Sequence, residues 1–271
     1  MGSRFPEAAI VVPLRGYKGH MPNSSDRDLE AEIRSRSIPH HVAFIPDGNR
    51  RFSNQIHASL AEGYRAGYDK VEDVLRWCGE FSVPVVSIWV LSIDNFSRPA
   101  SEVATLLALI EDRIPALVEL QRKAAVPRRL QWLGRRDIFN ERLRLIIDRA
   151  EAETASYGPF ALNLALGYGG REEIVDAVKH LLADAAAAGE STAALAARLT
   201  AADIGSRLYD SGPAPDLIVR TSGELRLGGF LLWQSASAEL FFCDALWPAL
   251  RRVEVLEALR SYQQRDRRHG R

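Results

Sequence analysis

The feature that most limits what this 271-residue chain can fold into is its alternation of short apolar runs with long amphipathic segments. Apolar runs of strand length occupy residues 41–45, 83–92, 129–134, 159–167, 216–223 and 238–244. Helical patterns lie between most of them and at the end of the chain, at 50–81, 98–125, 135–154, 169–189 and 248–268. Strands joined by long helices form parallel sheets with helices on both faces. The sequence therefore predicts a Rossmann-like, single α/β domain of about six mostly parallel strands.

The first 38 residues do not share this alternation. They are polar and interrupted by glycine and proline, with one short amphipathic stretch at 28–36. We interpret residues 1–38 as a mobile N-terminal arm with one or two helical turns, and residues 39–271 as the catalytic domain. Within that domain we expect the first long helix to break near Gly63 and Gly67, and Pro115 to kink the next one. The alanine-rich segment 185–203 predicts short helices.

Charge and cysteine content exclude several classes of protein. The chain has 35 Lys+Arg and 35 Asp+Glu and so no formal net charge, which argues against a nucleic-acid-binding protein. Its two cysteines, Cys78 and Cys243, lie far apart in apolar surroundings, so we expect reduced thiols and a cytoplasmic protein. No apolar run is long enough for a transmembrane segment, and the start of the chain has no secretory pattern.

Arginine, accompanied by glycine, serine or asparagine, follows four of the six predicted strands. These arginine-bearing segments are 47–51, 92–98, 167–171 and 220–226. In open parallel sheets, ligands bind at the carboxyl ends of the strands. Since four separate strand ends have the same chemistry, we expect them to form one site.

The residue types in these segments are suited to a diphosphate. Arginine forms bidentate, charge-assisted bonds with phosphate, and glycine lets the backbone approach an anion. Asp47 adds a carboxylate, which Mg²⁺ can bridge to phosphate oxygens. The sequence contains neither a GxxxxGK[ST] loop nor a GxGxxG loop, the usual nucleotide-binding motifs.

Each of these features also has a plainer explanation. Asp-Gly-Asn is most often a turn, and Arg220 or Arg226 alone is more often part of an ion pair. Glu239 could face solvent at the start of a strand. Tryptophans 77, 132 and 233 are more often core residues than ligand platforms. An enzyme that binds a nucleotide or sugar phosphate stays an alternative, because a fold does not determine function.

Five motifs taken together resemble one protein family. They are HVAFIPDGNRRF, SIDNFSRPASEV, NLALGYGGREEIVDAV, PDLIVRTSGELRLGGFLLWQSASAELFF and the terminal RRHGR. In this order, over residues 41–271, they resemble the cis-prenyltransferase family, the family of undecaprenyl diphosphate synthase-like enzymes. The resemblance implies a homodimer of Rossmann-like subunits, each with an apolar tunnel, that condenses isoprenoid diphosphates with the help of Mg²⁺.

The resemblance also implies roles for individual residues. Asp47 corresponds to the catalytic carboxylate that binds magnesium and diphosphate, and Glu239 to a carboxylate that completes the metal site. Asn95 corresponds to a catalytic residue that assists proton removal or diphosphate departure. Positions that correspond to substrate-binding residues are Gly48, Asn49, Arg50, Arg51, Phe52, Tyr64, Ser92, Asp94, Phe96, Arg98, Arg220, Arg226, Gly228, Arg268 and Gly270. The last two belong to an Arg-x-Gly motif that reaches across the dimer in related enzymes.

Several positions depart from the family pattern. Tyr64 stands where long-chain members have histidine, and Leu60 and Leu225 replace polar residues. Gly228 replaces a serine in the stretch that grips isopentenyl diphosphate, which removes a hydrogen bond worth roughly 1–3 kcal/mol. Because these changes cluster on the side of the second substrate, we hypothesise irregular, lavandulyl-type coupling of two allylic units head-to-middle, with or without cyclisation.

The expected reaction is the condensation of dimethylallyl or geranyl diphosphate with a second isoprenoid diphosphate. Val90 stands where long-chain members often have alanine facing the tunnel, and its extra methyl groups predict a short C10–C15 product. An ordinary cis head-to-tail synthase that uses isopentenyl diphosphate is the first alternative. A non-catalytic scaffold subunit is the second, and is disfavoured because Asp47 and the Arg-x-Gly motif are both present.

Overall fold

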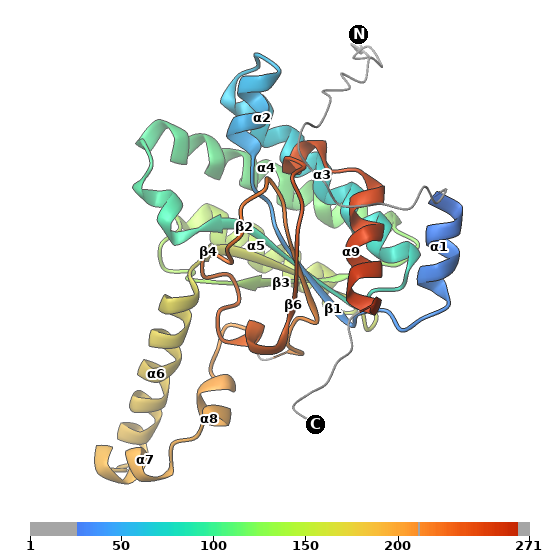
Figure 1. Cartoon of the computed structure of the whole chain (residues 1–271). Helices are drawn as coiled ribbons and strands as arrows, with labels where there is room; N and C mark the ends of the chain where they lie inside the picture. The colour runs from blue at the N-terminus through green and yellow to red at the C-terminus, as the bar shows by residue number, and fades with distance from the viewer. Residues whose placement is uncertain (1–25, 211, 265–271) are drawn as a thin grey trace.

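The computed structural model describes residues 26–210 and 212–264, and a six-stranded sheet lies at its centre (Figure 1). The strands are β1 (His41–Ile45), β2 (Val85–Ser92), β3 (Arg129–Leu133), β4 (Ala161–Tyr168), β5 (Leu217–Arg220) and β6 (Glu239–Phe242). Their order in space is β3-β4-β2-β1-β5-β6, and every neighbouring pair is parallel. The predicted α/β single domain with a parallel sheet is confirmed.

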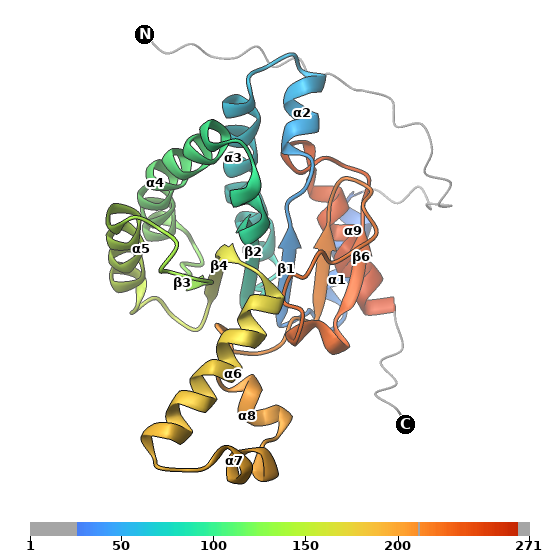
Figure 2. The ribbon, with the colours of Figure 1, turned by 90° about the vertical axis from the view of Figure 1, so that its left-hand side faces the viewer.

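Nine helices surround the sheet in the described part of the chain. They are α1 (Asp26–Arg34), α2 (Asn49–Gln55), α3 (Leu60–Glu80), α4 (Ala100–Lys123), α5 (Glu141–Thr154), α6 (Gly170–Ala187), α7 (Thr192–Arg198), α8 (Ala201–Gly205) and α9 (Arg252–Gln264). Helices α5, α4, α3, α9 and α1 contact one another in that order and cover the larger part of the core. Figure 2 shows α6, α7 and α8 projecting away from this layer, so they leave the carboxyl ends of the strands open.

The expected break of the first long helix near Gly63 and Gly67 is wrong. The chain leaves helical structure between α2 and α3, and Ser59 starts α3 with a capping box to Glu62. Both glycines lie inside α3, where they allow α2 to approach. A Cβ atom on Gly63 would lie 2.9 Å from the Asn49 carbonyl oxygen, and one on Gly67 would lie 2.2 Å from Asn49 Oδ1. Close packing between helices, and not a helix end, therefore explains these glycines.

Part of the predicted N-terminal arm packs on the domain. Helix α1 buries Leu29 and Ile33 in the main core, and Gln263 Nε2 of α9 donates to the Ile33 carbonyl at 2.9 Å. Residues 1–25 lie outside the described residues. The division into an arm and a catalytic domain therefore stays a prediction.

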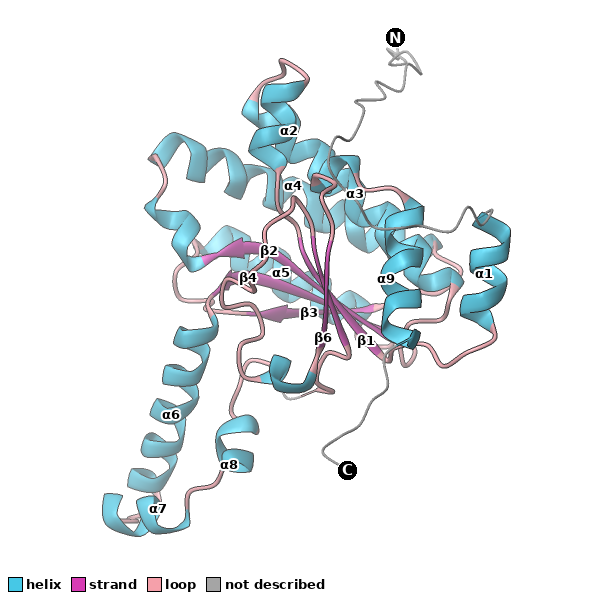
Figure 3. Ribbon diagram, viewed as in Figure 1, coloured by secondary structure: helices cyan, strands magenta, loops and turns pink. Residues whose placement is uncertain are grey.

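The structure also bears on the predictions made for the cysteines, the tryptophans, the alanine-rich segment and Pro115; Figure 3 distinguishes the helices from the strands and loops. Cys78 and Cys243 are free and buried, and tryptophans 77 and 132 are core residues, whereas Trp233 is only partly buried. The alanine-rich segment forms α7 and α8, and Pro115 lies inside α4 without ending it. In the part of the chain that is described, no helix has the length and hydropathy of a membrane span.

Candidate active site

Asp47 lies at the carboxyl end of β1, where Figure 2 shows the strand leading into α2. Its Oδ2 atom accepts a hydrogen bond of 2.8 Å from Arg220 Nη2, and Arg51 Nη2 lies 3.5 Å from Oδ1. Partial burial opposes ionisation of this carboxyl group, but the hydrogen bond and charge of Arg220 and the charge of Arg51 outweigh it. They hold the pKa of Asp47 below its ordinary value. Asp47 is therefore an anion bound by two arginines.

The backbone around Asp47 is held by residues far away in the sequence. Its N–H donates to Thr221 Oγ1 at 2.9 Å, and its carbonyl accepts from the Trp247 N–H, also at 2.9 Å. Gly48 follows with a φ of 103°, and a Cβ atom there would lie 2.7 Å from Leu246 Cδ2. Only glycine fits this turn, because both the left-handed backbone and the close neighbour exclude a side chain.

Thr221 and Ser222 are two site residues that the sequence analysis missed. Both are buried, and Ser222 has the left-handed φ of 77°. Arg51 donates to Ser222 Oγ at 2.5 Å through Nη2 and to the Ser222 carbonyl at 3.1 Å through Nη1. A residue with a strained backbone, such as Ser222, is kept in place by its surrounding contacts, and such residues are common at functional sites. Their position directly after Arg220 was the available signal in the sequence.

The end of β2 carries the second polar group of the site. Ser92 and Asn95 form a reciprocal cap, in which the Asn95 N–H donates to Ser92 Oγ at 3.2 Å and the Ser92 N–H donates to Asn95 Oδ1 at 3.1 Å. This cap starts the 3₁₀ turn η1 (Ile93–Ser97) and orients Asn95. The amide nitrogen of Asn95 stays available for another partner.

Arg98, Tyr64 and Glu102 form a compact hydrogen-bonded group beside this turn. Tyr64 donates from its hydroxyl to Glu102 Oε1 at 2.7 Å, while Arg98 Nη1 donates to that hydroxyl at 2.8 Å and to Glu102 Oε1 at 3.0 Å. Burial, together with the hydrogen bond to Glu102, raises the pKa of Tyr64 to about 12, so the phenol stays neutral. Glu102 was missed because it lies 38 residues from Tyr64 in sequence and only the fold joins them.

A cavity of about 210 Å³ unites these groups at the carboxyl ends of β1, β2 and β5. Its polar lining comes from Asp47, Asn49, Tyr64, Ser92, Asn95, Arg98 and Arg220. Its apolar lining includes Tyr68, Val71, Ile88, Val90 and Leu106. A second cavity of about 40 Å³ shares Tyr68, Val71 and Val90 with the first, so the apolar space continues between α3 and α4. A charged mouth with an apolar interior suits a molecule that has a diphosphate head and a hydrocarbon tail.

Several residues expected in the site do not line this cavity, namely Gly48, Arg50, Arg51, Phe52, Asp94, Phe96, Arg226, Gly228 and Glu239, although Arg51 contacts Asp47. Phe96 packs against Phe139 with ring centroids 5.7 Å apart. The Arg226 side chain is 64% exposed and pairs with Glu224, although its carbonyl accepts a hydrogen bond from Arg220. Arg268 and Gly270 lie outside the described residues.

Glu239 is not brought beside Asp47 within one chain. It begins β6 opposite Leu217, whereas Asp47 follows the level at which Ile45, Arg220 and Phe242 are paired. Three residues of strand separate these levels, which is about 10 Å along the sheet. A shared metal ion would therefore need Glu239 from another copy of the chain.

Asp47 fits the chemistry of a magnesium ligand that is completed by the substrate. Among the described residues there is no cluster of three or more histidine, cysteine or acidic side chains. Protein sites that hold Mg²⁺ with substrate phosphates commonly provide only one or two carboxylates, and the phosphates and water supply the rest. Asp47, half-buried at the cavity mouth, matches that arrangement.

Comparison with known proteins agrees with this geometry. The family model described as "Putative undecaprenyl diphosphate synthase" matches residues 45–270, which is most of the chain. The chain belongs to this family. An isoprenyl transferase of Thermus thermophilus is 46% identical over 247 residues, covering 91% of this chain and 94% of that protein. This enzyme is thus an isoprenyl transferase, a prenyl diphosphate synthase of the cis type.

Two further relatives differ in the products that their names give. A (2Z,6E)-farnesyl diphosphate synthase of Thermobifida fusca is 43% identical and covers 90% of this chain and 95% of that protein. The crystal structure of lavandulyl diphosphate synthase from Lavandula x intermedia, in complex with dimethylallyl diphosphate, superposes with a TM-score of 0.81. It is 28% identical and covers 89% of this chain and 100% of that one.

Proposed function

We propose that this isoprenyl transferase condenses a short allylic diphosphate with isopentenyl diphosphate, head-to-tail and in the cis configuration. The observation that carries the proposal is the cavity in which Asp47 and Arg220 stand at the mouth and Val90 stands at the apolar end. The relatives named isoprenyl transferase and farnesyl diphosphate synthase, at 43–46% identity, favour this regular coupling. They favour it over the head-to-middle hypothesis raised by the sequence alone.

The residues of the cavity, and Arg51 beside Asp47, would have separate parts in this reaction. Asp47 would hold Mg²⁺, which would withdraw charge from the departing diphosphate of the allylic substrate. Arg51 and Arg98 would bind diphosphate oxygens, because preorganised cations stabilise the charge that develops on the leaving group. Asn95 would place its free amide group near the departing diphosphate or the proton that is lost. The apolar walls would keep water away from the allylic cation.

The size of the apolar space supports a C10–C15 product. The main cavity of about 210 Å³ is smaller than the roughly 300–1,000 Å³ of most pockets for drug-sized ligands. Val90 lines both this cavity and its small extension, so its side chain stands where a growing tail would pass. The name of the farnesyl diphosphate synthase relative is in keeping with a short product.

Head-to-middle coupling stays a second candidate because of the loop between β5 and β6. Gly228 there has a φ of 64°, and a Cβ atom would lie 3.3 Å from both Arg220 Nη1 and Trp89 Cζ3. A serine at this position would be strained and tight, so the loop is built around glycine. Leu225 is 76% exposed. The second substrate would thus meet fewer hydrogen-bond donors here than the family pattern supplies.

We also propose that the active form is a homodimer in which each site is completed by the partner. Strand β6 is at an edge of the sheet and carries Glu239 at its start. Glu239 cannot reach Asp47 of its own chain. A second copy paired along this edge would let Glu239 of one chain and Asp47 of the other bind the same metal ion. The Arg-x-Gly motif would reach the partner's site in the same assembly.

A product assay tests the function directly. The protein, with Mg²⁺, is given dimethylallyl diphosphate alone, then with isopentenyl diphosphate, then geranyl with isopentenyl diphosphate, and dephosphorylated products are identified by mass spectrometry. We expect linear cis products of C10–C15 that form only when isopentenyl diphosphate is present. A branched or cyclic product from dimethylallyl diphosphate alone would replace this proposal with head-to-middle coupling. No condensation in any mixture would support the scaffold alternative.

A further inference from the structure

The wall of the apolar part of the site includes a charged side chain. Most walls of the smaller cavity are hydrocarbon, contributed by Val71, Val90, Ile110, Ile114, Leu117, Leu164 and Leu166. The charged members of its lining are Glu72 of α3 and Arg113 of α4. No part of the regular reaction described above requires a guanidinium group at this position, so another reason must be found for it.

Arg113 crosses the seam between α4 and α3. Its Nη2 atom lies 3.1 Å from Asp69 Oδ1 on α3, and its Nε atom lies 3.7 Å from Asp112 Oδ2. The Arg113 side chain is 25% exposed, whereas that of Asp69 is 57% exposed. The arginine therefore runs from the lining of the cavity to the surface, where the ion pair with Asp69 holds its outer end.

The inner part of the same side chain is poorly satisfied. Arg113 Nε is buried and has no hydrogen-bond partner. Tyr68 lies beside the cavity, and burial raises the pKa of its phenol, so Tyr68 does not act as a counter-ion for the arginine. A buried N–H group without a partner lowers the stability of the fold, so its presence needs an explanation.

We propose that Arg113 is a specificity-determining residue that closes the apolar space and sets the longest isoprenoid tail the enzyme accepts. This inference rests on the proposed function, because it concerns the tail of that reaction's substrate and product. A tail that grows past Val90 would have to displace the guanidinium group or lie against it. Either event removes a charged group from water or from its ion pair, and both are unfavourable.

The fold contains room beyond this barrier. A cavity of about 440 Å³ lies farther along the same helices, lined by Leu75 of α3 and Leu120 of α4, and it shares Glu72 with the smaller cavity. Space alone therefore does not stop a tail at Arg113. Glu72 borders both cavities and Arg113 lines only the smaller one, while the larger cavity has the charged side chains of Arg76, Glu80 and Arg128 beside its leucines.

Binding of unreactive substrate analogues tests the inference without turnover. Farnesyl and geranylgeranyl S-thiolodiphosphates are titrated, with Mg²⁺, against the wild-type protein and R113L, R113A and R113K. We expect the wild type to bind the farnesyl compound at least about tenfold more tightly than the geranylgeranyl compound. R113L and R113A should abolish most of that preference, and R113K should retain it. D69N, at an exposed carboxylate, should weaken the preference without disturbing the core.

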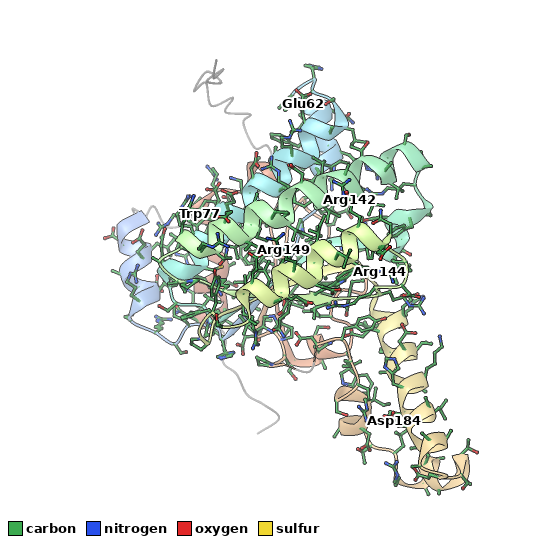
Figure 4. The ribbon with its side chains drawn as sticks, turned by 180° about the vertical axis from the view of Figure 1, so that it is seen from behind. Glu62, Trp77, Arg142, Arg144, Arg149 and Asp184 are labelled. Carbon is green, nitrogen blue, oxygen red and sulfur yellow. The ribbon has the colours of Figure 1, made fainter. Side chains whose placement is uncertain are left out.

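The control is R149L, which removes an arginine on the outer face of α5 that pairs with Glu153 (Figure 4). It should keep the wild-type preference, and thermal melting should show that all variants are folded. In the product assay, R113L and R113A should shift the longest product upward by at least one isoprene unit. Folded R113L and R113A that keep the wild-type tail preference overturn the inference. Altered tail binding in a protein that makes no condensation product supports Arg113 but overturns the proposed function.

Discussion

The buried polar groups at the two ends of the same parallel sheet lie in different surroundings. At the amino ends, His41 has a partner at each ring nitrogen, 2.7 Å from the Pro213 carbonyl and 2.7 Å from Ser87 Oγ. Arg128, only 1% exposed, donates to the Val83 carbonyl at 2.8 Å and to the Pro84 carbonyl at 3.0 Å. These contacts tie loops to strands, and no cavity of the candidate active site touches them.

At the carboxyl ends, polar groups surround an open cavity and some have no partner. Asn49 Oδ1 and Arg220 Nε are buried without a hydrogen-bond partner, although both residues line the cavity. Buried polar groups in folded proteins are nearly always paired, so we expect a ligand or water in the cavity to complete these two. The amino ends therefore hold the fold together, while the carboxyl ends are arranged for substrate. Variants at the two ends should therefore differ in which property they lose.

The largest expected effect comes from D47N at the carboxyl end. It keeps the size of the side chain but removes the negative charge that Arg220 and Arg51 bind and that Mg²⁺ would require. We expect kcat/KM for condensation to fall by at least about 10²–10³-fold, the range seen when one preorganised electrostatic group is lost. Steady-state kinetics together with a thermal melt measure both properties. A fully active D47N would show that the cavity mouth is not the reaction centre.

At the amino end, R128M should have the opposite effect. Removing the guanidinium group leaves the buried Val83 carbonyl without the donor that Arg128 supplies, while the Pro84 carbonyl keeps its bond from the Ala161 N–H; the free energy of unfolding should fall by roughly 1–3 kcal/mol. The KM of the folded enzyme should not change. R129M, at the neighbouring exposed arginine, is the matched control and should unfold like the wild type. Urea denaturation measures the difference. If R128M raised KM while unfolding normally, the contrast between the ends would fail.

A smaller effect on binding is expected from E102Q. Glu102 positions Arg98 and Tyr64, so loss of its charge should let the Arg98 guanidinium move from its place in the cavity. We expect KM for the allylic diphosphate to rise by about tenfold, with kcat changed less. The rate should show no tyrosine titration below about pH 11, because burial raises the pKa of Tyr64 to about 12. E119Q, a substitution at an exposed residue of the same helix, should leave KM and kcat unchanged. An equal fall in kcat and kcat/KM for E102Q would instead give Glu102 a role in the chemical step.

The smallest expected effect is a pH dependence at the amino end. Burial lowers the pKa of His41 below 6.5, even though Asp210 and Asp216 nearby raise it and its bond to Pro213 does the same. The unfolded chain therefore takes up a proton first as the pH falls. The stability that neutral His41 contributes is present above about pH 6.5 and is lost as the pH falls towards its folded pKa. Unfolding free energies at pH 8 and pH 5 should differ more for the wild type than for H41Q. A pH dependence unchanged in H41Q would remove His41 from this role.

The sequence by itself determined the elements and their type. The pattern HVAFI predicted a strand over the same residues, 41–45, that form β1, and the alternation of strands with helices predicted a parallel sheet. These predictions succeeded because the spacing of apolar residues within one short segment indicates whether that segment is a strand or a helix. The same strand pattern placed Asp47, Asn95, Arg98 and Arg220 after strand ends, and the structure brings them into one cavity, while their roles stay predictions.

The tertiary structure alone decided which residues meet. Asp47 is 174 residues from Thr221, and Tyr64 is 38 residues from Glu102, so no local pattern could pair them. Gly63 and Gly67 were misinterpreted for the same reason, because the residues packed against them, Asn49 above all, belong to another helix. Glu239 was assigned to the site by its motif, but strand register separates it from Asp47 of the same chain, so its role stays a prediction that needs a second copy. A pattern shows what a segment is, whereas distances between segments depend on how they pack.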